Sequence, residues 1–309
     1  TDAKIARTDM QTPLWMRAPG TVSGAFALES ALDELSYKLG IDPLELRLIN
    51  YAEKDPDTGR PFSSKELREC YRQGAEKFGW KDRKPQPRSM QDGRFMVGWG
   101  LATGTWGAFL APSSARVTLK ADGTALVESG TTDIGPGTYT TISLIAARQL
   151  GLPLETVAFR FGDSNLPSAP SQGGSITTAS VGTAVQECAQ IVQKDLIDIE
   201  SKREGSIFSG VAFENVVFEN GKVSIKGRSD TGMTIAEILN RNNLGELKAE
   251  HTTRPDYGDR GKYATASHGA QFVEVKLDED LGLVRVTRVV QATAAGKIIN
   301  PKGAHSQEM

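Results

Sequence analysis

The sequence of 309 residues has a formal net charge of −2, and 39% of its residues are hydrophobic. This composition excludes a disordered chain, and the near-neutral charge excludes a basic protein that attracts nucleic acid or anionic lipid. No apolar stretch approaches the ~18 residues that a membrane-spanning helix needs. Cys70 and Cys188 stand far apart and form no Cys-x-x-Cys pair. Two free core thiols are therefore favoured over a disulfide, and no protein-held metal site is expected.

Helical signals fill the first part of the chain. Thr21–Leu39 carries apolar residues at helical spacing and is followed by a glycine, the usual C-cap. Asp42 followed by Pro43 predicts the N-cap and the first position of a second helix. Ser63 and Glu66 fit the S-x-x-E pattern of a capping box, which predicts that a third helix begins there.

The later part of the chain mixes strands, hairpins and helices. Short apolar runs bounded by turn residues predict strands at 95–105, 115–120, 124–128, 157–161, 271–277 and 283–292. Asn220-Gly221 predicts a further hairpin turn. Helices are predicted at Thr140–Leu150 and Ser180–Ile199, with a short one from Thr234. Without a steady strand–helix alternation, these elements favour an α+β fold with layered mixed and antiparallel sheets and packed helices.

Glycine is the unusual feature of the composition. The 32 glycines exceed the ~7% average. Many stand in short clusters with Ser and Thr at 98–107, 130–137 and 173–182. Such loops suggest backbone that packs closely against something large and polar.

Two of the clusters lead into predicted helices and offer donors to an anionic or polar ligand. They read DIGPGTYT at 133–140 and GGSITT at 173–178, and neither has the spacing of a Walker A or Rossmann motif. A simple strand–turn–helix joint explains the first segment equally well. The second divides evenly between a ligand loop and ordinary N-capping.

Two shorter segments and three aromatic residues carry weaker signals. Arg17 in MRAPG can aim a guanidinium at an anionic or carbonyl group, although a surface loop explains it as well. Gly296–Pro301 reads as a turn. Trp106 and Phe109, near Trp99, are candidates for a pocket or for the core. The three histidines have no metal-ligand spacing.

At these four segments the chain resembles the molybdopterin-binding large subunit of the xanthine dehydrogenase and aldehyde oxidase family. It is most similar to the branch of bacterial aldehyde oxidoreductases. The resemblance implies that Arg17 lies near the molybdenum or the substrate and that Trp106 and Phe109 line the substrate pocket. It also implies that the two glycine segments hold the pterin and its phosphate, through Gly135, Gly137, Thr138, Gly174, Ser175, Ile176 and Thr177. Pro136 departs from the glutamine usual at that position of the first segment.

The resemblance further implies a molybdenum hydroxylase that oxidises aldehydes or N-heterocycles, such as purines, with water as the oxygen source. The cofactor would be molybdenum–molybdopterin in a dinucleotide form, with the metal held by the pterin and not by protein ligands. Iron–sulfur and FAD centres would belong to partner subunits. The general-base glutamate is expected beyond Met309, so no catalytic residue is assigned here.

The chain is therefore expected to be a central piece of a longer subunit. When isolated, it is expected to be inactive and to bind little or no molybdenum cofactor. Its expected divisions are a helical lead-in at 1–90, a first molybdopterin-binding subdomain at 91–205 and the start of a second at 206–309. The alternatives are a non-catalytic assembly or binding module of the same family and a phosphate- or nucleotide-binding protein. A cytoplasmic location is favoured over a periplasmic one.

Overall fold

The computed structural model describes residues 7, 9–11, 14–255 and 261–309. The chain divides into two compact units, each built from stretches that are separated in the sequence. Unit 1 contains the described part of Thr1–Glu53, Lys65–Trp106 and Ala266–Ala294. Unit 2 contains Lys54–Ser64, the described part of Gly107–Thr265 and Ala295–Met309. The division into three consecutive segments at 1–90, 91–205 and 206–309 stays a prediction.

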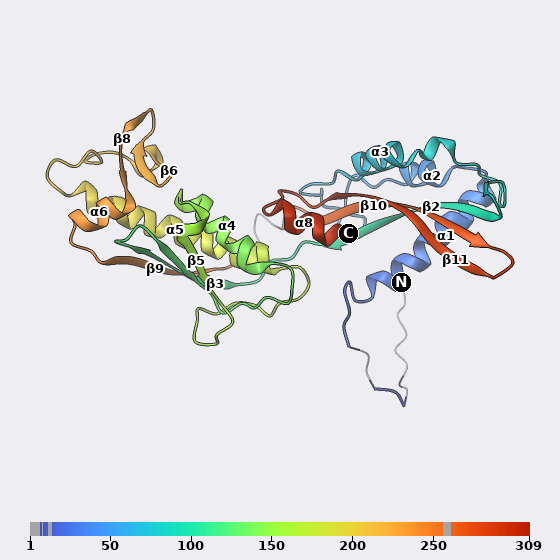
Figure 1. The fold of residues 1–309 in the computed structure, drawn as a ribbon, viewed down its shortest axis with the longest axis horizontal. Helices are drawn as coiled ribbons and strands as arrows, with labels where there is room; N and C mark the ends of the chain where they lie inside the picture. Colours follow the sequence, from blue (N-terminus) through green and yellow to red (C-terminus); the bar gives the residue numbers. More distant parts are fainter. Residues whose placement is uncertain (1–6, 8, 12–13, 256–260) are drawn as a thin grey trace. The chain divides into compact units, whose positions relative to one another are not determined.

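Unit 1 is a four-stranded sheet with helices (Figure 1). Its sheet has the strand order β1-β2-β10-β11. Its elements are α1 (Thr21–Leu39), α2 (Pro43–Ile49), α3 (Leu67–Phe78), a 3-10 turn at Trp80–Asp82, β1 (Gln91–Asp92), β2 (Phe95–Gly107), β10 (Ala266–Asp278) and β11 (Leu283–Ala294). The predicted helix limits at Gly40 and at Asp42-Pro43 are confirmed: Gly40 is a left-handed C-cap, and Asp42 accepts a hydrogen bond from the Leu44 amide.

The core of unit 1 lies between α3 and the sheet. Phe272 on β10 is fully buried, and its ring centroid lies 5.8 Å from that of Phe78 and 5.4 Å from that of Trp80. Gly74 in α3 allows this packing, because a Cβ there would lie 2.5 Å from Phe272 Cε2. The helix and the strand therefore approach more closely than any larger residue would permit.

Helix α1 packs through its polar side. The buried Arg47 of α2 binds Glu29 Oε2 at 2.6 Å and Asp33 Oδ1 at 2.9 Å. Leu28 and Leu35, in contrast, are 61% and 42% exposed. The apolar spacing predicted the helix correctly, but the leucines do not form its packed side.

The predicted capping box at Ser63 and Glu66 is wrong. Glu66 is itself the N-cap of α3, and no side chain caps this helix. Ser63 instead lies at a bend and donates its backbone N–H to Ala264 O at 2.9 Å. The Glu66 side chain of a capping box would need that same N–H, so the reciprocal pair does not form.

Unit 2 contains the other helices and two sheets, in the orders β5-β4-β3-β9 and β6-β7-β8. Its elements are β3 (Ser113–Lys120), β4 (Ala125–Glu128), α4 (Thr138–Leu150), a 3-10 turn at Leu154–Thr156, β5 (Val157–Arg160), α5 (Thr177–Ser201), a 3-10 turn at Phe213–Asn215, β6 (Val216–Glu219), β7 (Lys222–Ile225), β8 (Arg228–Thr234), α6 (Ile235–Arg241), β9 (Glu246–Thr253) and α8 (Pro301–Glu308). Strands β8 and β9 and helix α8 are additions to the predicted elements.

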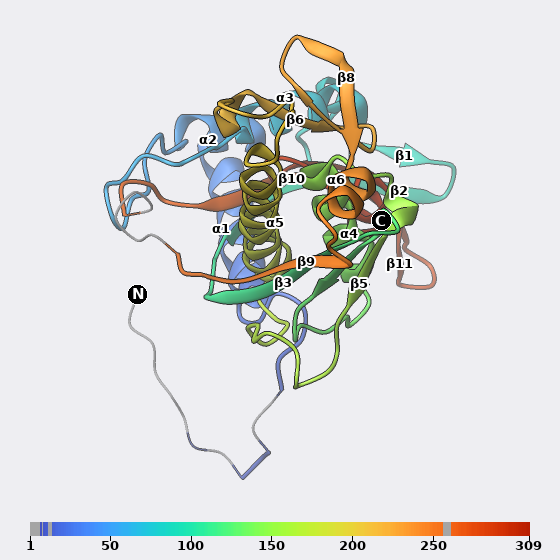
Figure 2. The same ribbon diagram turned by 90° about the vertical axis from the view of Figure 1, so that its left-hand side faces the viewer.

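The direction of the strands in the larger sheet positions the functional loops. β3 pairs antiparallel with β4 and with β9, whereas β4 and β5 are parallel. Parallel neighbours need a crossover between them, and α4 supplies it. Helices α4 and α5 both lie over this sheet (Figure 2).

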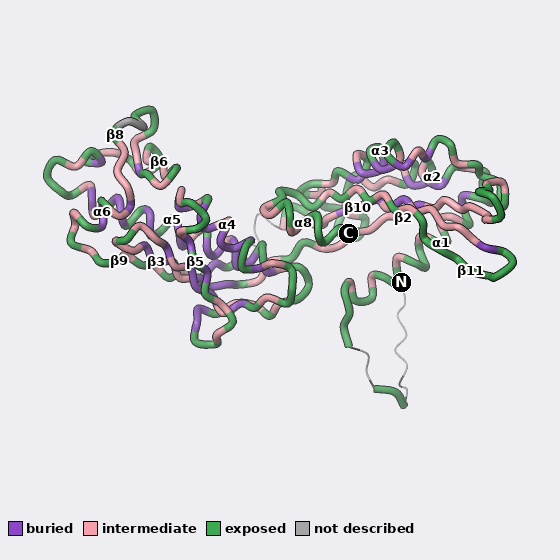
Figure 3. The backbone as a smooth tube through the Cα atoms, viewed as in Figure 1, coloured by how far each residue is buried: buried purple, intermediate pink, exposed green. Residues whose placement is uncertain are grey.

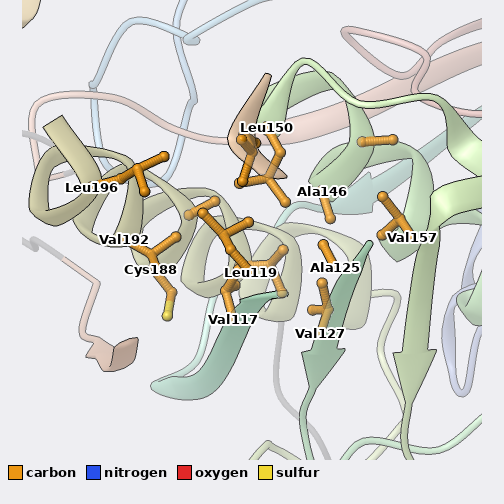
Figure 4. Packing of buried hydrophobic residues seen from close by; sticks show 14 of the residues in the cluster. Val117, Leu119, Ala125, Val127, Ala146, Leu150, Val157, Cys188, Val192 and Leu196 are labelled. Atoms are coloured by element: carbon orange, nitrogen blue, oxygen red, sulfur yellow. The ribbon is translucent and has the colours of Figure 1, made fainter. Parts of the chain in front are cut away.

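The core of unit 2 fills the space between the sheet and these two helices. Figure 4 shows part of this single cluster, with Val117 and Val127 from the strands, Leu150 from α4, and Cys188 and Val192 from α5. The buried residues of this unit gather where the helices meet the strands (Figure 3). Both cysteines are free and buried, as predicted.

The observed architecture confirms the α+β prediction, with helices layered on mixed and antiparallel sheets. The predicted hairpin turn is confirmed too, since Asn220 and Gly221 both have positive φ between β6 and β7. Within the described part of the chain, no helix combines the length and the hydrophobicity needed to cross a membrane.

Candidate functional site

Two loops follow the parallel strands β4 and β5. The first loop, residues 129–137, joins β4 to α4, and the second loop, residues 161–176, joins β5 to α5. The last residues of the strands, Glu128 and Arg160, are register partners. Because the carboxyl ends of parallel neighbours meet at one edge of a sheet, both loops leave from the same edge.

Hydrogen bonds join the two loops along their length. The Gly130 amide donates to Pro167 O at 2.6 Å, and the Gly162 amide donates to Thr131 O at 2.8 Å. Gln172 in the second loop accepts from Thr132 Oγ1 at 3.3 Å and donates to Thr138 Oγ1 at 3.1 Å. The two predicted glycine segments, at Gly135 and at Gly174, are thus parts of one loop pair.

Helices α4 and α5 begin at this loop pair and run in the same direction. A Cβ on Gly182 would lie 2.6 Å from Ile145 Cδ1, and farther along Gln149 Nε2 donates to Gln193 Oε1 at 3.1 Å. Since residue numbers increase together in both helices, their N-termini lie at the same end. Two helix dipoles therefore direct their positive ends toward the same loops.

Neither N-terminus has a side-chain cap or an acidic residue in its first turn. The N-caps are Gly137 and Ile176. The first N–H groups of a helix have no partner inside it. The loop pair therefore presents N–H donors and partial positive charge, which suits an anion.

The backbone of the loops takes left-handed conformations beside open space. Gly135 and Gly137 have φ of 117° and 81°, and a Cβ added at either would meet nothing within 4 Å. Ser175 has φ of 61°, which is strained for a residue with a side chain. The exposed hydroxyl of Ser175 is thereby held at the start of α5.

Two aspartates organise the loops from within. Asp133 Oδ1 accepts the Gly135 amide at 2.8 Å, so this amide is engaged inside the first loop. Asp163 Oδ1 accepts the Asn165 amide at 2.9 Å, and this hydrogen bond lowers the pKa of the Asp163 carboxyl. The predicted ligand contact of Gly135 therefore requires Asp133 to release that amide or the ligand to bind another group of the loop.

The loop pair also includes residues outside the set predicted from the sequence. Thr132 and Gln172 connect the loops, as described above. Tyr139 in the first turn of α4 has its ring centroid 6.2 Å from that of Phe161, which itself stacks on Phe159 at 5.2 Å. Thr131 Oγ1 is buried without a hydrogen-bond partner among the described residues. Tyr139 was visible in the first glycine motif, whereas no motif marked the others.

The remaining predicted site residues stand outside the two loops in the sequence. Arg17 and Trp106 belong to unit 1, whereas Phe109, which is 58% exposed, belongs to unit 2 with the loop pair. The segment Gly296–Pro301 begins α8, where Asn300 Oδ1 accepts the Gly303 amide at 3.1 Å. Among the described residues, no three His, Cys, Asp or Glu side chains form a group suited to a metal ion.

Comparison with known families shows to which family the chain belongs. A family described as "Molybdopterin cofactor-binding domain" matches residues 73–309, and a second family of that description matches residues 1–51. The chain belongs to the molybdopterin cofactor-binding domain family. Among its curated relatives are the aldehyde oxidoreductase molybdenum-binding subunit of Escherichia coli K12, 38% identical, and the xanthine dehydrogenase molybdenum-binding subunit of Escherichia coli O157:H7, 27% identical.

These relatives are longer than this molybdopterin cofactor-binding chain. Each alignment covers 99% of the chain but only 40% and 41% of the respective relative. Two solved structures share the fold: quinoline 2-oxidoreductase from Pseudomonas putida 86 (TM-score 0.77, 20% identity, 92% of this chain and 38% of that one) and CO dehydrogenase from Oligotropha carboxidovorans (TM-score 0.76, 20% identity, 94% and 38%).

The loop pair has the donor groups that a molybdopterin cofactor requires. Molybdopterin carries a phosphate, which the N-termini of α4 and α5 suit through their uncapped first turns. The open space at Gly135 and Gly137 permits close approach of a large ring system. The chain is accordingly a molybdopterin cofactor-binding chain that aligns with part of its longer aldehyde oxidoreductase and xanthine dehydrogenase relatives.

Proposed function

We propose that the loop pair is the place where this chain holds molybdenum–molybdopterin. The observation that carries the proposal is the convergence of two glycine-bearing loops and two uncapped helix N-termini at one edge of the sheet. The first N–H groups of α4 and α5 would bind phosphate oxygens. The hydroxyls of Thr138, Ser175 and Thr177, with the backbone of Gly137, Gly174 and Ile176, would bind the pterin and its phosphate.

The activity that we propose is oxidation of an aldehyde or an N-heterocycle, with water as the oxygen source. When bound, the cofactor supplies the two-electron and oxygen-transfer chemistry, and the chain orients it. Arg17, Trp106 and Phe109 would contact the substrate or lie near the metal. The two loops contain no glutamate, so we assign the general base to neither of them.

Partner subunits form the second part of the proposal. The relatives named above are molybdenum-binding subunits, and this naming supports separate subunits with iron–sulfur and FAD centres that accept the electrons. A dinucleotide form of the cofactor agrees with the two helix N-termini, because each could hold one phosphate. Because the chain spans about 40% of the relatives' length, we expect it alone to be inactive and to bind the cofactor so weakly that it retains little or no molybdenum.

Calorimetry tests the binding function directly. Purified molybdopterin, titrated into the chain at high concentration, should bind weakly but with saturable heat, whereas ATP at the same concentration should not bind. Binding of ATP without binding of molybdopterin would favour the nucleotide-binding alternative. Molybdenum analysis of the purified chain tests the retention claim, and a near-stoichiometric content would contradict it.

A further inference from the structure

Gln172 occupies a central place in the loop pair although it belongs to no recognised motif. It lies half-buried in the second loop, directly before Gly173 and Gly174. Its side-chain amide makes two hydrogen bonds, accepting from Thr132 Oγ1 at 3.3 Å and donating to Thr138 Oγ1 at 3.1 Å. Thr132 belongs to the first loop, and Thr138 is the residue that directly follows it.

The two threonines bracket the most adaptable part of the first loop. Between Thr132 and Thr138 lie five residues, 133–137, including the glycines with φ of 117° and 81°. Glycine loses more conformational entropy on ordering than any other residue. The Gln172 side chain holds both ends of this segment and therefore limits the conformations of residues 133–137. It also fixes the distance between this segment and the second loop.

We propose that Gln172 is a positioning residue that sets the separation of the two loops before the cofactor binds. Thr138 is the first residue of α4, and the residues after Gln172 lead into α5. The Gln172 side chain thus helps to fix the position of the α4 N-terminus relative to the α5 N-terminus. A neutral amide can do this without adding negative charge beside an anionic ligand. The ligand part of this inference rests on the proposed function, but the ordering of the loops does not.

Substitution of Gln172 should loosen both loops. In Gln172→Ala, backbone amides at 131–138 and 172–177 should exchange hydrogen about tenfold faster without cofactor, the size expected from losing two hydrogen bonds. The affinity for molybdopterin should fall by about tenfold, because the loops must then be ordered on binding. Hydrogen exchange followed by mass spectrometry measures the first effect, and calorimetry measures the second.

Gln149→Ala is the matched control. Gln149 is also half-buried, and its side chain also joins α4 to α5, because Gln149 Nε2 donates to Gln193 Oε1 at 3.1 Å. A second bond, from Gln193 Nε2 to the Gln149 backbone carbonyl at 2.7 Å, remains in the variant. It lies at the opposite end of α4 from the loop pair. Its loss should leave exchange at 131–138 and 172–177 unchanged. Equal loosening of the loops by both variants would mean a general weakening of helix packing and would overturn the proposal.

Gln172→Glu separates positioning from charge. Both threonine hydroxyls can donate to a carboxylate, so the loops should stay as protected as in the wild type. The added charge should still weaken binding of the anionic cofactor by about tenfold or more. Faster exchange in this variant, or unchanged exchange and affinity in Gln172→Ala, would contradict the assignment. If the wild type binds no molybdopterin while Gln172→Ala still loosens both loops, the positioning role stands and the proposed function fails.

Discussion

Glu128 and Arg160 end the two parallel strands side by side, with Glu128 Oε1 3.5 Å from Arg160 Nη1. The Glu128 carboxylate is buried and also binds Arg116 Nη1 at 3.2 Å. Arg160 reaches onward to Asp163 of the second loop at 3.4 Å. One buried carboxylate thus ties together the strands from which both loops depart.

Loss of the Glu128 charge should destabilise unit 2. We expect Glu128→Gln to lower the free energy of unfolding by about 1–2 kcal/mol, less than for a fully buried pair because both arginines remain solvated. Urea unfolding followed by circular dichroism measures this change. Glu246→Gln is the control, since Glu246 pairs with Lys248 at 3.6 Å on the surface, and its effect should stay within about 0.5 kcal/mol. Equal effects of the two variants would show that Glu128 has no special role.

A negative charge at Ser175 should prevent cofactor binding. Ser175 has φ of 61°, a conformation that Asp and Asn adopt more readily than most residues. Ser175→Asp should therefore keep the backbone while placing a carboxylate beside the anionic cofactor, with an affinity loss of at least about tenfold. Ser175→Asn has nearly the same shape without the charge and should bind within a few-fold of the wild type. Calorimetric affinities that are alike for both variants would count against a cofactor contact at this position.

Removal of the Phe272 ring should destabilise unit 1. Phe272 is fully buried against Phe78 and Trp80, and Phe272→Ala should cost about 3–5 kcal/mol of unfolding free energy. All four tryptophans of the chain lie in unit 1, so tryptophan fluorescence during urea unfolding reports on this unit. Leu35→Ala, on the exposed side of α1, should change the value by less than about 0.5 kcal/mol. A comparable loss in the Leu35 variant would contradict the observed packing.

Stability of unit 2 should depend on Cys188 at alkaline pH. Burial raises the pKa of the Cys188 thiol to about 11 from an ordinary 9.0. The folded state therefore favours the neutral thiol, and this contribution to stability is complete below pH 9 and is lost as the pH rises through about 11. Unfolding followed by circular dichroism at pH 8 and at pH 10.5 should show a smaller decrease for Cys188→Ala than for the wild type. A larger decrease in stability for Cys188→Ala than for the wild type would mean that the thiolate is tolerated inside the fold.

Local signals in the sequence predicted most element boundaries. The glycine at position 40, the Asp42-Pro43 pair and Asn220-Gly221 each act through their own backbone preferences, so the structure confirms them. The capping box failed because Ser63 is held by the distant Ala264. A short-range pattern contains no information about such a pairing.

The site was predictable only in part for the same reason. The glycine motifs indicated two loops, but their meeting depends on the parallel pairing of β4 with β5, which joins strands that α4 separates. Gln172 could not be found from sequence, since a single glutamine has no distinctive spacing. Its two threonine partners stand 34 and 40 positions away along the chain. Only the assembled fold brings these three side chains together.

The most direct test of the central claim is hydrogen exchange of the chain with and without saturating molybdopterin. We predict that cofactor bound by the loop pair slows exchange at the amides that begin α4 and α5, within 137–140 and 174–180, and leaves exchange in the β6–β8 sheet unchanged. Slowed exchange confined to other parts of the chain, with the loop pair unaffected, would contradict it.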